Sequence, residues 1–266
     1  MPLVDSARAI VTGAGSGLGR AFCLEVARRG GRVLCADIDE AAARRTAAEI
    51  GDAAVAARAD VARIEEVEAL ATQAETLWGG VDLVINNAGV AVGGPVGEVP
   101  LDDWRWIVGV NFWGVVHGCH VFAPRLRRQR RGHIINVASA AGLLSPPGMA
   151  PYNATKAAVV ALSETLRGEL GDSGVGVTVL CPTFFRTNIA SNGRAVDRKQ
   201  MAVVEKLMSA SKIQADDVAR FALDAAGRDE LYALPHADGR WMWRLKRWVP
   251  SSYSVLAGRL VRRIAR

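Results

Sequence analysis

The sequence predicts one α/β domain built on a parallel, doubly wound sheet. Short apolar runs alternate along the 266-residue chain with longer stretches of helical periodicity. The runs 33–36, 83–85 and 134–138 show little alternation of apolar and polar residues, which indicates strands covered on both faces. A glycine-rich turn joins the first apolar run to the first helical stretch. A chain of this length buries roughly 70–75% of its unfolded surface, which is enough for one large core.

The elements can be placed in order along the chain. Strands are expected where runs of aliphatic residues lie between charged or glycine-rich segments, at 7–12, 32–37, 53–59, 81–86, 132–138, 175–181 and 231–234. Helices are expected at 17–30, 39–50, 63–78, 102–129, 151–171 and 215–227. The arginine-rich end of the fourth helix, before Gly132, is typical of a helix C-terminus. Right-handed crossovers then place helices on both faces of the sheet.

The first turn has the composition of a phosphate-binding loop. Residues 12–19 read TGAGSGLG and stand between a predicted strand and a predicted helix. Glycines let the backbone approach a pyrophosphate, and a helix N-terminus offers free N–H groups and the positive end of its dipole. A flexible turn would have a similar composition. The position of residues 12–19 between a strand and a helix nevertheless favours nucleotide binding.

The second predicted strand ends in an acid, Asp37, which lies 18 residues beyond Gly19. A carboxylate at this place can accept hydrogen bonds from the adenosine ribose of NAD, and it repels the 2′-phosphate of NADP. Ser16 is uncharged and no cation directly follows Asp37, so neither position favours that phosphate. The alternative is that Asp37 caps the helix predicted at 39–50.

Tyr152 and Lys156 are four residues apart on a predicted helix, so they share one face. An ammonium beside a phenol lowers the tyrosine pKa from about 10 towards the working range, where the phenol can exchange a proton with an alcohol or carbonyl. Ser139 lies upstream, at the end of an apolar run. Taken alone, the four-residue spacing is also typical of an exposed Tyr/Lys helical pair that has no function.

With these residues placed, the chain resembles the short-chain dehydrogenase/reductase family from about Ala7 to Tyr232. The motifs that carry the resemblance stand in the family's order: Thr12, Gly13, Gly17 and Gly19; Asp60-Val61; Asn86-Asn87-Ala88-Gly89; Asn111; Ser139, Tyr152 and Lys156; Pro182 and Thr187. The resemblance implies a Rossmann-type sheet of seven strands in the order 3-2-1-4-5-6-7, with NAD across the carboxyl ends of the strands. The NAD-binding residues expected here are Thr12, Gly13, Ser16, Gly17, Leu18, Gly19, Asp37, Ile38, Asp60, Val61, Asn87, Ala88, Gly89, Tyr152, Lys156, Pro182 and Thr187.

The resemblance also implies four catalytic roles. Ser139 would hydrogen-bond the substrate oxygen, and Tyr152 would act as general base in oxidation and general acid in reduction. Lys156 would lower the tyrosine pKa and bind the nicotinamide ribose. Asn111 would hold a water that links Lys156 to solvent; the alternative for this residue alone is a helix defect. The chain departs from the family pattern after Pro182, where Thr183 replaces a common glycine and could narrow the pocket.

The segments expected around the substrate are apolar. They are 140–151, the pair Phe184-Phe185 and the region 188–212, with few charges near Ser139 or Phe184. A hydrophobic secondary alcohol or ketone fits best, unless these residues only pack the loop. The leading interpretation is an NAD-dependent alcohol dehydrogenase. The alternatives are an NADPH-dependent ketone reductase and a catalytically silent nucleotide-binding scaffold.

Composition bears on the redox state of the cysteines, on membrane spans and on metal binding. Four cysteines without paired spacing are expected to be buried free thiols in a reducing, cytoplasmic setting. The start of the chain has no signal-peptide pattern, and no continuous apolar run approaches the roughly 20 residues of a membrane span. The four histidines have no metal-ligand spacing, so no metal is expected.

Charge divides the chain into a catalytic domain, 1–239, and a basic C-terminal extension, 240–266. The extension holds eight basic residues and no acidic one, which leaves 25 basic and 27 acidic residues in 1–239. This distribution argues against nucleic-acid binding by the domain. In the extension, Leu256, Leu260 and Ile264 recur every four residues, with arginines interleaved and three tryptophans upstream. We expect peripheral contact with an anionic membrane, subunit assembly or coverage of the active site.

A homodimer or homotetramer is expected from the apolar outer positions of two helices. Helices 102–129 and 151–171 carry Trp104, Trp113, Val160 and Leu166. In proteins that this chain resembles, the corresponding helices pair across a two-fold axis.

Overall fold

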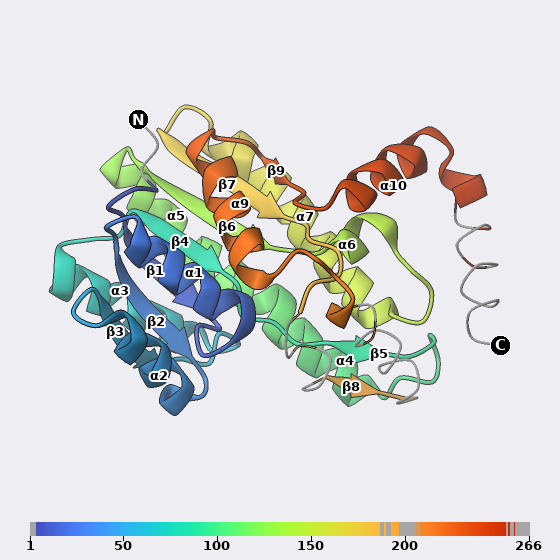
Figure 1. Ribbon diagram of the computed structural model, residues 1–266, viewed down its shortest axis with the longest axis horizontal. Helices are drawn as coiled ribbons and strands as arrows, with labels where there is room; N and C mark the ends of the chain where they lie inside the picture. The colour runs from blue at the N-terminus through green and yellow to red at the C-terminus, as the bar shows by residue number, and fades with distance from the viewer. Residues whose placement is uncertain are drawn as a thin grey trace.

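The computed structural model describes residues 4–186, 189, 193–196, 206, 208–253, 255 and 258. Its centre is a seven-stranded parallel sheet in the order β3-β2-β1-β4-β6-β7-β9, covered by helices (Figure 1). The strands are β1 (Arg8–Thr12), β2 (Arg32–Asp37), β3 (Ala54–Arg58), β4 (Leu83–Asn86), β6 (Gly132–Val137), β7 (Val175–Leu180) and β9 (Tyr232–Ala233). Numbered along the chain within this sheet, they have the order 3-2-1-4-5-6-7, so the predicted fold class is confirmed.

The helices agree with the predicted ranges to within a few residues at most of their ends. They are α1 (Gly17–Arg28), α2 (Glu40–Ile50), α3 (Ile64–Trp78), α4 (Leu101–Val108), α5 (Gly114–Gln129), α7 (Ala150–Leu170) and α9 (Ala215–Gly227). A π-helical turn, η1 (Gly109–Trp113), joins α4 to α5. Two further helices were not predicted: α6 (Ala140–Leu144) and α10 (Ala237–Trp248), which crosses the predicted boundary at residue 239.

Two apolar layers enclose the sheet, because successive strand residues point to opposite faces. On one face, Val11 joins a buried cluster with Phe22 of α1 and Leu223 of α9. On the other face, Ile10 joins a cluster with Leu70 of α3 and Phe122 of α5. Both faces are therefore covered, as the unalternating apolar runs predicted.

A second, two-stranded sheet was not predicted. β5 (Val92–Gly93) pairs in parallel with β8 (Arg194–Ala195), far along the chain. Strands of two residues have no periodicity, and their pairing is non-local, so the sequence carries no signal for them. This pairing fixes residues 194–196 beside α4, where Arg194 forms an ion pair with Asp103 (2.7 Å).

The long helical stretch Leu101–Gln129 has the length and apolar composition of a membrane span, but half of its most apolar window is buried inside the fold. It packs on α3, α7 and β6 as a core element. Two residues predicted on the outer faces of the pairing helices, Val160 and Leu166, are also buried in the core, so that prediction is wrong for them. All four cysteines are buried free thiols, as expected.

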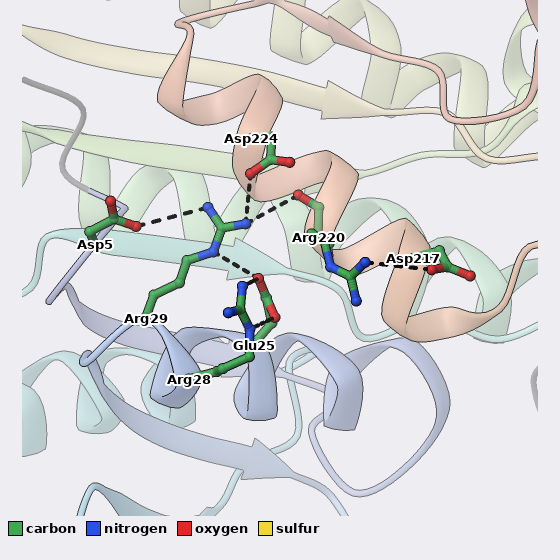
Figure 2. Close-up of polar contacts among 7 residues, drawn as sticks. All are labelled: Asp5, Glu25, Arg28, Arg29, Asp217, Arg220 and Asp224. Carbon is green, nitrogen blue, oxygen red and sulfur yellow. Dashed lines mark hydrogen bonds and ion pairs between the residues drawn. The ribbon is translucent and has the colours of Figure 1, made fainter.

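Charged side chains join α1 to α9 across the edge of the molecule (Figure 2). Arg29 donates to Glu25 Oε1 (2.9 Å) on its own helix and to Asp224 Oδ1 (2.7 Å) on α9. Arg28 also donates to Glu25 through two nitrogens, at 2.6 and 2.7 Å. Only 7% of the Glu25 side chain is exposed, so this carboxylate depends on both arginines for its hydrogen bonds.

We predict that Glu25→Gln lowers the free energy of unfolding by about 1–3 kcal/mol at pH 7, because a buried carboxylate and its charge-assisted hydrogen bonds are lost. Arg28, and then Arg29, hold the pKa of the Glu25 carboxyl below its ordinary value. Its contribution is therefore fully present above the unfolded-state pKa of about 4.3 and is lost as pH falls through the lower folded-state pKa. Urea unfolding across pH measures both effects.

The matched control is Glu49→Gln, which removes the exposed ion pair between Glu49 and Arg20. An exposed pair contributes about 0–1 kcal/mol. Equal effects of the two substitutions, or a gap between them that remains once the pH is below the folded-state pKa of Glu25, would contradict the importance of Glu25.

Candidate active site

One large cavity of about 700 Å³ lies at the carboxyl ends of the central strands. It brings together nearly all of the predicted cofactor-binding residues, together with Ser139. The predicted residues that line it are Gly13, Ser16, Gly17, Leu18, Gly19, Asp37, Ile38, Asp60, Val61, Asn87, Ala88, Gly89, Ser139, Tyr152, Lys156 and Pro182. Thr12 and Asn111 do not line it, and Thr187 lies outside the described residues.

The glycine turn is shaped by close contacts of its own backbone. A Cβ atom on Gly19 would lie 1.9 Å from the Gly13 carbonyl oxygen, and one on Gly13 would lie 2.8 Å from Ala88 Cα. Gly13 and Gly17 also have positive φ, +66° and +51°, which favours glycine. Ser16 is the exposed N-cap of α1 and makes no capping hydrogen bond. The start of α1 therefore faces the cavity without a side chain across it, a cradle that fits a pyrophosphate.

Thr12 has a structural position rather than one in the cavity. It is buried, and its Oγ1 accepts hydrogen bonds from the N–H groups of Asn87 (3.0 Å) and Ala88 (3.1 Å). Asn87 Nδ2 in turn donates to the Thr12 carbonyl oxygen (2.8 Å). The prediction that Thr12 itself contacts the dinucleotide is therefore not supported: the residue ties the glycine turn to the loop after β4.

The Asp37 carboxylate is held in place by two backbone groups. Gly15 N–H donates to Oδ2 (2.8 Å), and Asp39 N–H donates to Oδ1 (3.0 Å). The cap of α2 is Asp39, which accepts from Ala42 N–H (3.1 Å), so the alternative role of Asp37 as that cap is wrong. Lys156 is the one cation among the cavity-lining residues in the described part of the chain. No described cation accompanies Asp37 in the cavity to receive a 2′-phosphate.

Ser139, Tyr152 and Lys156 converge on this cavity from two adjacent elements. Ser139 follows β6 and caps α6, where its Oγ accepts from Ala141 N–H (3.1 Å). Tyr152 and Lys156 lie on one face of α7, as their spacing predicted. A Cβ atom on Gly142 would lie 2.5 Å from the Lys156 carbonyl carbon, so α6 packs directly on α7 because this residue is glycine. That contact sets the distance between the serine and the tyrosine–lysine pair.

The pKa shifts at this pair differ from the sequence-based expectation. Burial raises the pKa of the Tyr152 phenol, and its hydrogen bond with Ser139 opposes this only in part. Burial also lowers the pKa of the Lys156 ammonium to about 8. Lys156 Nζ donates to the Val137 carbonyl oxygen (2.8 Å) and lies 5.8 Å from the centre of the Tyr152 ring. The pKa of Tyr152 is therefore raised rather than lowered in this structure, because desolvation outweighs the hydrogen bond with Ser139.

Asn111 lies in the π-helical turn η1 and is fully buried. Its Oδ1 accepts from Val90 N–H (2.8 Å), and its Nδ2 donates to the Val90 carbonyl oxygen (2.9 Å). The side chain thus holds the backbone that follows Gly89 against the helix. A Cβ atom on Gly89 would lie 3.4 Å from Asn111 Oδ1 and 3.5 Å from Lys156 Nζ, so both side chains approach this glycine closely. Asn111 therefore lies both in a helix defect and near Lys156. Its role in holding a water stays a prediction.

The end of the cavity beyond Ser139 is largely apolar. Phe184 and Phe185 line it, as expected, and so do Ile189 and Met208 of the region 188–212. Within 188–212, the structure describes residues 189, 193–196, 206 and 208–212. Met149 lines the cavity from the expected segment 140–151. Sequence reasoning did not assign several further lining residues, among them Trp106 of α4 and Met242 and Tyr253 of the C-terminal extension. No local motif marks them, since only the chain topology brings them to the cavity.

Thr183, where the chain departs from the family pattern, lines the cavity and is fitted to the start of α10. Its N–H donates to His236 Nδ1 (3.3 Å), and its hydroxyl donates to Asp238 Oδ1 (3.5 Å). A Cβ atom on Gly239 would lie 2.7 Å from Thr183 Cγ2. The side chain at 183 is therefore accommodated by a glycine on the neighbouring helix.

Comparison with known proteins agrees with this geometry. A family model described as short chain dehydrogenase matches residues 7–197. The chain is 37% identical over 238 residues to the 1-deoxy-11-beta-hydroxypentalenate dehydrogenase of Streptomyces exfoliatus, which covers 87% of this chain and 84% of that protein. It is also 38% identical over 194 residues to the putative oxidoreductase SadH of Mycobacterium tuberculosis, covering 71% of this chain and 70% of that protein.

Solved structures match over most of the chain. A short-chain dehydrogenase/reductase from Burkholderia phymatum in complex with NAD aligns with a TM-score of 0.87 and 40% identity, over 93% of this chain and 95% of that chain. A short-chain dehydrogenase from Sphingobium yanoikuyae in complex with NADPH aligns with a TM-score of 0.76 and 28% identity, over 88% and 90% of the two chains.

Proposed function

The chain belongs to the short-chain dehydrogenase/reductase family of oxidoreductases, and we propose that it transfers a hydride between NAD(H) and a hydrophobic secondary alcohol or ketone. One observation carries the proposal. The glycine cradle, the Ser139, Tyr152 and Lys156 side chains and an apolar end all belong to the same cavity. A dinucleotide and an apolar substrate can therefore meet at the tyrosine.

The chain's own residues would position the substrate and move its proton. The bound dinucleotide supplies the hydride acceptor or donor. Ser139 Oγ would donate a hydrogen bond to the substrate oxygen, and the Tyr152 phenol would exchange the proton with that oxygen. Because burial raises its pKa, this phenol is protonated at neutral pH and suited to donate a proton to a carbonyl. Oxidation of an alcohol requires the reverse transfer, to the phenolate.

The preference for NAD rests on Asp37. Its carboxylate lines the cavity, is fixed by Gly15 and Asp39 N–H groups, and has no described cation beside it there. The same carboxylate disfavours a 2′-phosphate by charge. Of two similar proteins, one has NAD and the other has NADPH in its structure. The shared fold therefore does not distinguish the cofactors, and the preference for NAD is supported by Asp37.

An uncharged apolar substrate is supported by the composition of the cavity. Its far end is lined by aromatic and aliphatic side chains, including Trp106, Phe184 and Met242. Lys156 is the one described cation in the lining and is already assigned to the site. The similar protein from Streptomyces exfoliatus is named for dehydrogenation of a hydroxylated carboxylate, which supports an alcohol as substrate but not the absence of charge.

We predict that the protein produces NADH absorbance from NAD and a panel of hydrophobic secondary alcohols, and that Tyr152→Phe removes most of this turnover. Acid–base catalysis contributes about 10²–10⁴-fold, and the Tyr152 phenolate is the assigned proton acceptor in oxidation. NAD binding and the melting temperature should change little. Tyr232→Phe is the matched control, because Tyr232 is a partly buried tyrosine that does not line the cavity. Turnover by Tyr152→Phe within a few-fold of wild type would refute the mechanism.

Cofactor choice gives a second prediction. The ratio of kcat/KM for NAD to that for NADP should exceed one, and Asp37→Ala should reduce it by about tenfold or more, through loss of the ribose acceptor and of the repulsion. Asp39→Ala is the control, since Asp39 caps α2 and does not line the cavity. A wild-type preference for NADP would favour the alternative of an NADPH-dependent ketone reductase.

We also propose a homodimer or homotetramer formed through the helical face of α4, α5 and α7. Trp113, on the turn between α4 and α5, is 50% exposed, and Leu101 is 68% exposed. Such apolar surface fits a self-complementary interface. Sedimentation should show a species larger than the 28.3 kDa chain at micromolar concentration, and Trp113→Glu should shift it towards the monomer. A monomer alone in the wild type would contradict the proposal.

A further inference from the structure

The helix α10 has two faces with different surroundings, and its inner face is fixed to the active-site cavity. Met242 lines the cavity. Trp243 packs on Tyr232 with ring centres 4.9 Å apart, and Lys246 Nζ donates to the Leu143 carbonyl oxygen (2.7 Å) at the end of α6. Three side chains on one face therefore hold α10 against the catalytic domain.

The outer face of α10 is apolar and exposed. Trp241, Leu245 and Trp248 are spaced at i, i+4 and i+7, so they form one stripe along the helix. They are 71%, 52% and 86% exposed, although all three side chains are large and apolar. Figure 1 shows α10 at the edge of the molecule, projecting away from the sheet. We call these three residues the outer stripe.

Cations accompany the outer stripe. Arg244 and Arg247 are exposed residues of the same helix, and the Arg244 guanidinium lies 5.8 Å from the centre of the Trp241 ring. The sequence from 240 to 266 contains eight basic residues and no acidic one. A partner for this surface must therefore be both apolar and anionic. The rest of the chain, with 25 basic and 27 acidic residues, carries a net charge of about −2, so a second copy offers only a small acidic excess.

We propose that the outer stripe docks on the surface of an anionic lipid bilayer. Tryptophan and leucine side chains enter the region between headgroups and acyl chains, while arginines pair with anionic headgroups. Because Met242 lies on the same helix, docking brings one wall of the cavity to the membrane. Apolar substrates dissolved in the bilayer would then be close to the site; this last step rests on the proposed function, whereas the docking does not.

The test is co-sedimentation of the full chain with vesicles, without cofactor or substrate, so that failure of the proposed function leaves it unaffected. The probes are vesicles of phosphatidylcholine and of phosphatidylcholine mixed in equal parts with phosphatidylserine. The wild type should bind the mixed vesicles at least about tenfold more tightly, and added salt should weaken this binding. Trp241→Ala combined with Trp248→Ala should lower the partition coefficient at least about tenfold.

Charge is tested separately by Arg244→Gln combined with Arg247→Gln. This variant should lose most of the preference for anionic vesicles. Because it changes only exposed side chains, it also serves as the test if the tryptophan variant does not fold. The controls are Leu77→Ala and Arg45→Gln, exposed residues of α3 and α2 that lie outside the proposed oligomer face. They should bind within about twofold of wild type. Equal binding to both vesicle types, no binding, or equal losses in variants and controls would overturn the proposal. So would a smaller oligomer of the tryptophan variant with unchanged vesicle binding.

Discussion

The close approach of the glycine turn to the loop after β4 is the constraint on which the site depends. Two neighbouring parallel strands end side by side, and Asn87 binds the backbone of Thr12 while Thr12 Oγ1 accepts the N–H groups of Asn87 and Ala88. No side chain fits at Gly13 or Gly19 without collision. These contacts hold the cradle at the start of α1 and direct Gly89 towards Lys156.

The second constraint is burial of the tyrosine–lysine pair. Desolvation disfavours both charged forms, so it raises the pKa of Tyr152 and lowers that of Lys156 to about 8. Lys156 compensates part of its own desolvation by donating to the Val137 carbonyl oxygen. The site therefore combines a neutral phenol, a hydroxyl from Ser139 and a buried amine, which suits proton exchange with a carbonyl or alcohol oxygen in an apolar cavity.

Local patterns predicted the frame of this site well. The positions of the strands along the chain and of Asp37 follow from runs and turns a few residues long, whereas the strand order in the sheet was implied by the family resemblance; the structure confirms all three. Contacts between distant segments were not predictable in this way. Thr12 matches a binding motif but serves packing, and Val160 and Leu166 look like outer residues until the neighbouring helices cover them. The β5–β8 pairing and the cavity contacts of Met242 and Tyr253 likewise arise only from the topology.

The central claim is direct hydride transfer between a substrate carbon and the nicotinamide, within a cavity where Tyr152 handles the proton. It is tested most directly with a hydrophobic secondary alcohol that the enzyme oxidises, carrying deuterium on the carbinol carbon, and with mass analysis of the NADH produced. We expect one deuterium in each NADH formed and a slower chemical step with the deuterated alcohol in single-turnover measurements. NADH that contains only solvent hydrogen would contradict the account.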